Sequence, residues 1–231
     1  MIAGPSVAGI LLTALIDGKA GLREYRCRLL NWRVAARWYA AALLIAPLLM
    51  MAVFLALALF SRKFVPGVFV SDDRTTLVLS GLAIALAAGI FEELGWTGFA
   101  IPRLRRRHGV VATGLVVGLV WGAWHVLVAL WASGSVSGAI AFTSYMLDPF
   151  LVLATFRVLM VWIYDRTESL LVAMLMHVSL TASARIIGAP GIAGLPLLTF
   201  DLVWFAAVWT LIAVIAMAKP FSGQSLRNRV A

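Results

Sequence analysis

Charged residues are scarce in this sequence. Only 13% of its 231 residues are Asp, Glu, Lys or Arg, whereas a soluble domain carries about a quarter. The single cysteine, Cys27, excludes an internal disulfide and any metal cluster built on cysteines. Residues 1–18 lack the basic stretch and small-residue cleavage site of a signal peptide, so we expect a short first membrane span there instead.

Apolar residues make up 63% of the chain, and the mean hydropathy is +1.00. Apolar runs of about 20 residues predict transmembrane helices, because a helix satisfies its own backbone hydrogen bonds in lipid. We predict an all-α, polytopic membrane bundle with one domain over residues 1–231. In the fifth span, Asp148 and Pro149 predict a kink or an interruption. The seven expected spans are 2–17, 37–60, 77–99, 109–132, 138–164, 168–188 and 197–218.

The Lys and Arg residues lie mostly in the loops on one side of these spans. Only Arg62, Lys63 and Arg74 fall on the other side. The positive-inside rule therefore predicts a cytoplasmic C-terminus, and we expect the bacterial plasma membrane. Topology explains the net charge of +9 better than nucleic-acid binding does. The basic side carries Lys19, Arg23, Arg26, Arg28, Arg33, Arg37, Arg103, Arg105, Arg106, Arg107, Arg166, Lys219, Arg227 and Arg229.

Residues 18–36 interleave arginines with leucines and Trp32. This pattern is typical of an amphipathic element that lies on the cytoplasmic leaflet, with membrane lipids as its partner. A plain connecting loop with topological charges explains it equally well. In the fourth span, Gly114, Gly118 and Gly122 repeat every four residues and predict close helix packing, which would bring His125 against a neighbouring helix.

Four ionisable residues stand inside the apolar spans: Glu92, Glu93, His125 and His177. Such groups are costly in a membrane, so each is a candidate functional residue. A lone histidine can instead make a structural hydrogen bond between helices, and nearby arginines can hold an acidic pair. Because the four residues come from three separate spans, we predict that they share one polar site.

The chemistry of these side chains leaves two mechanisms open. A carboxylate and an imidazole can bind a water molecule and take its proton, while a second imidazole and a hydroxyl can donate hydrogen bonds to an oxyanion. This set suffices for peptide hydrolysis without a cofactor. Alternatively, Glu92, His125 and His177 could ligate zinc.

Three stretches carry a family resemblance: "EELGWTGFAIPRL", "WGAWH" and "YDRTESLLVAMLMHVSLTAS". Over residues 85–185 the chain resembles the CAAX protease and bacteriocin-processing family (CPBP or Abi intramembrane proteases), in its prokaryotic branch. The family motifs are Glu-Glu-x-x-x-Arg, Phe-x-x-x-His and His-x-x-x-Asn. The resemblance implies an intramembrane endopeptidase in which Glu92 activates water, His125 assists and Glu93 supports, while His177 contributes to the oxyanion hole. It favours a glutamate protease without metal over a zinc protease.

The chain departs from the motifs at three positions. Thr97 replaces the motif arginine, so Glu93 must pair with another cation, be neutral or contact water. Arg157 and Arg185 are the candidate cations. Thr181 replaces the motif asparagine, and its hydroxyl can still donate one hydrogen bond. Trp121 replaces the motif phenylalanine, which we interpret as a conservative exchange.

These features predict an intramembrane protease that cleaves a peptide or membrane-protein substrate near the cytoplasmic membrane face. A weakly active or inactive homologue that acts as a scaffold or bacteriocin-immunity factor is the main alternative, and a small transporter is a third. The expected span limits place these residues at different depths in the membrane. Glu92 and His177 lie about 10–15 Å from the cytoplasmic boundary and His125 about 24 Å from it, which conflicts with a shared site. The sequence does not define the oligomeric state.

Overall fold

The computed structural model describes residues 2–133 and 138–218, and every regular element in these two stretches is a helix. Six helices are long and apolar enough to cross a membrane, and a shorter apolar helix covers Leu170–Ile186. The predicted all-α, polytopic bundle of about seven spans is confirmed. The elements are α1 Gly4–Leu29, α2 Ala36–Ala58, η1 Arg62–Phe64, α3 Gly67–Val70, α4 Arg74–Gly95, η2 Trp96–Ala100, α5 Ile101–Arg105, α6 Val110–Ser133, α7 Ala139–Asp148, η3 Pro149–Leu153, α8 Ala154–Thr167, α9 Leu170–Ile186 and α10 Leu195–Ala218.

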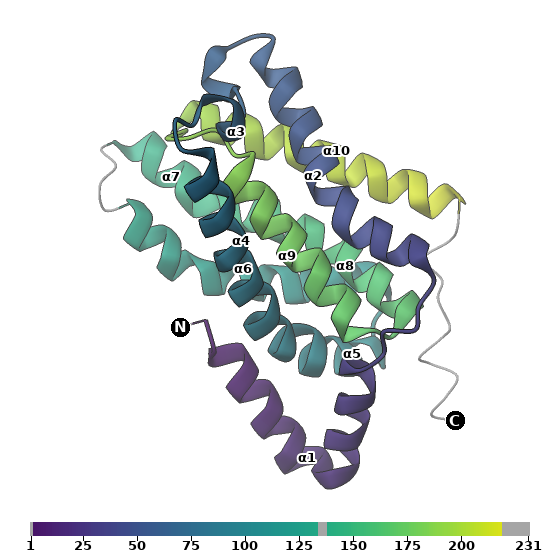
Figure 1. The fold of residues 1–231 in the computed structure, drawn as a ribbon. Coiled ribbons are helices and arrows are strands. Elements are labelled where there is room, and N and C mark those ends of the chain that lie inside the picture. The colour runs from purple at the N-terminus through teal and green to yellow at the C-terminus, as the bar shows by residue number, and fades with distance from the viewer. Residues whose placement is uncertain (1, 134–137, 219–231) are drawn as a thin grey trace.

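The sixth predicted span corresponds to α9, which lies inside the bundle. It packs against α4 and α2, and α6 packs against α8 (Figure 1). Aromatic side chains fill the core between α2 and α10, where the rings of Phe54 and Phe200 stack with centroids 4.4 Å apart. Large apolar side chains on the outer surface, such as Leu59 and Phe60, are more than four-fifths exposed, as expected for a surface that meets lipid.

Two spans contain a π-helical segment. The helix of α4 continues through η2 and α5 to Arg105, so the third span covers Arg74–Arg105 and not only residues 77–99. The fifth span changes to π-helical geometry at Pro149, where the sequence predicted an irregularity. In such a segment the backbone hydrogen bonds span five residues and not four. π-helical segments are frequent near functional sites. Here they lie next to Glu93 and Asp148.

The first helix folds back on itself at Gly18, whose φ of 60° and ψ of −150° suit glycine alone. The first arm of α1 therefore ends at Asp17, as predicted for the first span. The second arm, residues 19–29, returns toward α5 (Figure 1). The predicted amphipathic element is thus largely a helix and not a plain loop. Three basic residues of the predicted topology, Lys219, Arg227 and Arg229, lie outside the described residues.

The predicted glycine ridge of α6 packs against the fifth span. A Cβ atom at Gly114 would lie 2.6 Å from the Cα of Val158, and one at Gly118 would lie 2.6 Å from the Cα of Ala154. Both distances are too short for real atoms, so only glycine permits this approach of α6 and α8. The close packing predicted from the glycine repeat is confirmed.

We predict that Gly118→Val lowers the free energy of unfolding by about 2 kcal/mol, because the added side chain must push α6 away from α8. The measurement is thermal unfolding of the purified protein in detergent. Gly109→Ala is the control, since nothing lies within 4 Å of a Cβ there. Equal stability of the two variants would contradict the packing argument.

Candidate active site

Residues from three helices converge around one carboxylate. Glu92 on α4 is only 4% exposed, and its Oε2 accepts a hydrogen bond from Nε1 of Trp121 on α6 at 2.7 Å. On the same helix as Trp121, His125 places its Nε2 4.0 Å from the Oε1 of Glu92. His177 and Thr181 of α9 line the same cavity as Glu92. The residues predicted to share a site are therefore neighbours in the structure.

The hydrogen-bond partner of His125 defines the orientation of its ring. Its Nδ1 lies 2.9 Å from the carbonyl oxygen of Trp121. A carbonyl only accepts, so Nδ1 carries a hydrogen, and the neutral ring has its lone pair on Nε2, toward Glu92. The distance of 4.0 Å is too long for a direct hydrogen bond. It suits one water molecule that bonds to both groups.

The second glutamate, Glu93, is fully buried in a separate cluster of contacts. Its Oε1 and Oε2 each lie 2.8 Å from Nη1 of Arg157, and its Oε1 lies 2.8 Å from Nδ1 of His177. The hydroxyl of Thr97 donates to Oε2. Arg157 therefore replaces the missing motif arginine, as one of the two sequence hypotheses proposed. The other candidate, Arg185, instead lines the cavity.

Trp121 connects the two clusters. While its N–H donates to Glu92, its ring covers the guanidinium of Arg157, whose Cζ lies 3.9 Å from the ring centroid. The same ring meets that of His177 edge-on, at a centroid distance of 4.8 Å. The motif phenylalanine has no N–H group. Its exchange for tryptophan is therefore not conservative, contrary to the interpretation from the sequence. It adds a hydrogen-bond donor to Glu92.

The longer third span removes the conflict in depth between Glu92 and His125. Glu92 lies 13 residues before Arg105, and His125 lies 15 residues after Val110. At a rise of 1.5 Å per residue, these separations correspond to about 20 Å and about 22 Å. The two side chains can therefore meet without a strong tilt of either helix.

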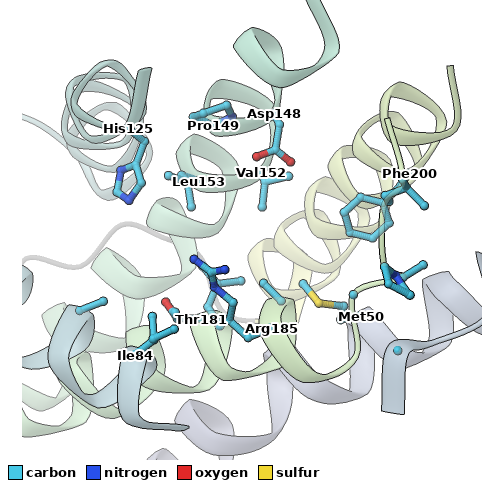
Figure 2. A pocket seen from close by; sticks show the side chains of 18 of the residues that line it. Met50, Ile84, His125, Asp148, Pro149, Val152, Leu153, Thr181, Arg185 and Phe200 are labelled. Carbon is cyan, nitrogen blue, oxygen red and sulfur yellow. The ribbon is translucent and has the colours of Figure 1, made fainter. Parts of the chain in front are cut away.

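A cavity of about 960 Å³ extends from this cluster. Its lining on α4 and α9 runs from Glu92 and His177 toward residues 70–72 and 188–190, away from the arginine-rich end of α5. Figure 2 shows His125, Thr181 and Arg185 around this space. The lining of the cavity thus extends to the end of the bundle opposite Arg105.

The sequence reasoning did not assign two further carboxylates to the site. Asp148 lines the cavity, and Asp201 of α10 is fully buried next to it. The two carboxyl groups lie close enough to share a proton in a hydrogen bond, and no N–H or hydroxyl of the described residues donates to Asp201. Asp201 stands in an apolar span, so the rule that selected Glu92 could have found it too.

The donor atoms do not fit a zinc ion as they are arranged. A tetrahedral zinc with bonds of about 2.0–2.1 Å separates its ligand atoms by about 3.3 Å, and the Glu92 and His125 atoms lie 4.0 Å apart. The Nδ1 atoms of both histidines bond to protein oxygens, which leaves their Nε2 atoms as the only candidate imidazole ligands. Among residues 2–133 and 138–218, no three His, Cys, Asp or Glu side chains form a metal-binding group. We therefore derive no step through a metal.

Fold and site together define a class: polytopic helical membrane proteins with a cluster of glutamates and histidines buried inside the bundle. Residues 74–183 match the family model described as "Type II CAAX prenyl endopeptidase Rce1-like". This stretch runs from the start of α4 into α9 and contains both glutamates, Trp121, both site histidines and Arg157. Over this region the chain matches the Rce1-like CAAX protease (CPBP or Abi) family, in agreement with the resemblance seen in the motifs.

One curated relative is similar over about half of the chain. It is the CAAX prenyl protease 2 of Methanococcus maripaludis, which is 27% identical over 121 residues. The aligned part covers 51% of this chain and 39% of the relative. The chain thus matches about two fifths of the length of that protein.

We predict that Arg157→Met destabilises the protein by about 3 kcal/mol or more, because it leaves Glu93 as a buried charge without its cation. Adding Glu93→Gln to Arg157→Met should recover much of this loss. Thermal unfolding of both single variants and the double variant measures the coupling. Arg185→Met is the matched control, and a similar loss in that variant, or additive effects in the cycle, would contradict the pair.

Proposed function

We propose that this protein is an intramembrane endopeptidase that hydrolyses a peptide bond with water activated by Glu92 and His125. The observation that carries the proposal is the separation of 4.0 Å between Glu92 Oε1 and His125 Nε2 at the wall of the cavity. Family membership supports a protease as well. The proposed site residues are Glu92, His125, His177, Glu93 and Thr181, with Trp121 and Arg157 as positioning residues.

In the first step, a water molecule donates its two hydrogens to Glu92 and His125. Its lone pair then points away from both acceptors and can attack a peptide carbonyl carbon. As the new C–O bond forms, Glu92 takes a proton from the water. The N–H of Trp121 holds the other oxygen of this carboxylate, which leaves Oε1 for the water.

In the second step, the carbonyl oxygen becomes an oxyanion and needs hydrogen-bond donors. Nδ1 of His177 donates to Glu93, so Nε2 carries a hydrogen only when the ring is an imidazolium. Glu92 holds the proton from water at this stage, so the negative charges are Glu93 and the oxyanion, and this imidazolium and Arg157 balance them. The hydroxyl of Thr181, one turn along α9, is the second donor. When the C–N bond breaks, the proton on Glu92 passes to the leaving amine.

Glu93 cannot be the base in this scheme. One of its oxygens binds Arg157 and His177, and the other binds Arg157 and Thr97. These contacts occupy the acceptor positions that a water molecule would need. The adjacent glutamates therefore have different roles: Glu92 does the chemistry, and Glu93 orients His177.

We propose that the peptide enters from the end of the bundle where residues 70–72 and 188–190 line the cavity. In the orientation predicted from Lys and Arg, this is the non-cytoplasmic end. The reacting bond would then lie at the depth of Glu92, about 20 Å from the arginine-rich end of α5. This route differs from the expectation, drawn from the sequence, of cleavage near the cytoplasmic membrane face.

One observation favours the alternative, a weakly active homologue that serves as a scaffold or immunity factor. Thr181 offers a single hydroxyl donor where the family motif has an asparagine amide. A scaffold does not need water activation, so substitution of Glu92 distinguishes the two functions.

We predict that Glu92→Gln lowers the rate of cleavage at least about 100-fold, because the amide cannot take a proton from water. Membranes from cells with the wild type and the variant are compared for new peptide termini. Asp73→Asn is the control, since Asp73 is exposed, lines neither pocket and caps a helix, a role that asparagine also fills. If the variant retains the cellular phenotype and no terminus depends on Glu92, the scaffold function holds instead.

The entry route predicts labelling of the cavity from one side of the membrane. Ala184 is exposed and lines the cavity, so we introduce Ala184→Cys together with Cys27→Ser. In intact cells, a membrane-impermeant maleimide should label this cysteine, and it should not label Cys27 of the wild type. If the reagent labels Cys27 in the wild type and does not label the Ala184→Cys variant, the cavity opens to the cytoplasmic side.

A further inference from the structure

A second pocket, of about 860 Å³, lies at the arginine-rich end of the bundle. It is bordered by the second arm of α1, the segment that follows it, the end of α5 and the turn between α8 and α9. Figure 1 shows this arm of α1 rising to α5. None of its lining residues belongs to the cavity that holds Glu92.

The lining of this pocket is rich in guanidinium groups. Two carboxylates, Glu24 and Glu168, also line it, so the positive charges exceed the negative ones by two. A concave surface with several guanidinium groups is suited to a phosphate group, because each guanidinium can offer two parallel hydrogen bonds. The four arginines of the pocket are Arg26, Arg28, Arg33 and Arg106.

Contacts between distant parts of the chain hold the pocket in shape. Nη1 of Arg28 donates to the hydroxyl of Tyr164 at 3.0 Å, and the amide of Asn31 donates to the carbonyl of Thr167 at 3.0 Å. The hydroxyl of Ser169 donates back to the carbonyl of Asn31 at 2.6 Å. The wall is therefore pinned to the turn between α8 and α9.

One donor in this wall has no acceptor. Nε of Arg28 is buried and makes no hydrogen bond with the described residues, and the nearest carboxylate, of Glu24, lies 3.6 Å away. A buried guanidinium N–H without an acceptor is costly. An anionic ligand in the pocket would supply acceptors to the guanidinium groups around it.

The rim of the pocket is apolar. Leu30 and Trp32 line it and are each 61% exposed, and the guanidinium of Arg33 lies 5.2 Å from the ring centroid of Trp32. Tryptophan is enriched where a membrane meets water. A free phosphate ion would gain nothing from this rim, whereas the acyl chain of a lipid would cover it.

We propose that this pocket binds the headgroup phosphate of an anionic phospholipid, from the leaflet that adjoins the arginine-rich loops. The arginines bind the phosphate, and the acyl chains pass over Leu30 and Trp32 into the membrane. This site is independent of the proposed peptidase function, because no residue of the cavity takes part in it.

The experiment uses the full chain, purified in neutral detergent and titrated with phosphatidylglycerol or phosphatidylcholine under native mass spectrometry. The test variant is Arg26→Gln with Arg106→Gln, since both side chains are exposed pocket residues. The matched control is Arg23→Gln with Arg107→Gln. These arginines lie on the same segments and carry the same charge, but they do not line the pocket.

We expect the wild type and the control to retain one phosphatidylglycerol and to prefer it to phosphatidylcholine. The test variant should bind it roughly thirtyfold more weakly, from the loss of two basic side chains near an anionic headgroup. Arg33→Gln should weaken binding in the same direction, which provides a second variant if the double one unfolds.

Three results would overturn the proposal. Equal weakening in the test and control variants would mean attraction by overall charge, without a site. Equal retention of the two lipids by the wild type would remove the role of the anionic headgroup. Displacement of the lipid by inorganic phosphate at the same concentration would indicate a site for soluble anions.

Discussion

The contact between Glu93 and Arg157 is the one on which the rest of the site depends. A carboxylate with no exposed surface costs several kcal/mol unless a cation compensates it, and Arg157 binds both of its oxygens. The pair joins α4 to α8, and the bond from His177 adds α9. Because Glu92 is the next residue along α4, the contact that anchors Glu93 also sets where the neighbouring carboxylate can lie.

The arginine that pairs with Glu93 lies on α8 here, whereas the family motif places it at position 97. Neighbouring helices must therefore leave room for Arg157 to reach Glu93. An arginine at position 97 would reach Glu93 along its own helix, but Arg157 must approach from beside α6. The glycine ridge of α6 makes room for it, since a Cβ at Gly118 would lie 3.1 Å from the Cβ of Arg157. Trp121, on the same helix, then covers the guanidinium. Features that looked unrelated in the sequence thus form one arrangement.

Hydropathy and charge were enough to predict the seven spans, the irregularity at Pro149 and the convergence of Glu92, His125 and His177. Each of these follows from a single segment or from the cost of a charge in lipid. The roles of the Trp121 N–H and of the π-helical turn after Gly95 could not be predicted. They depend on how two helices meet, and a one-dimensional pattern does not record that. The choice of Arg157 over Arg185 needed the same information.

Helix α8 connects the two ends of the molecule. Arg157 and Tyr164 are seven residues apart, about two turns, and so lie on nearly the same face of this helix. The first binds Glu93, and the second accepts a hydrogen bond from Arg28 at the edge of the basic pocket. A ligand that orders the arginines of that pocket therefore acts on the same face of α8 that holds the Glu93 cluster. One face of α8 thus carries the anchor of the Glu93 cluster and, two turns further along, part of the wall of the basic pocket.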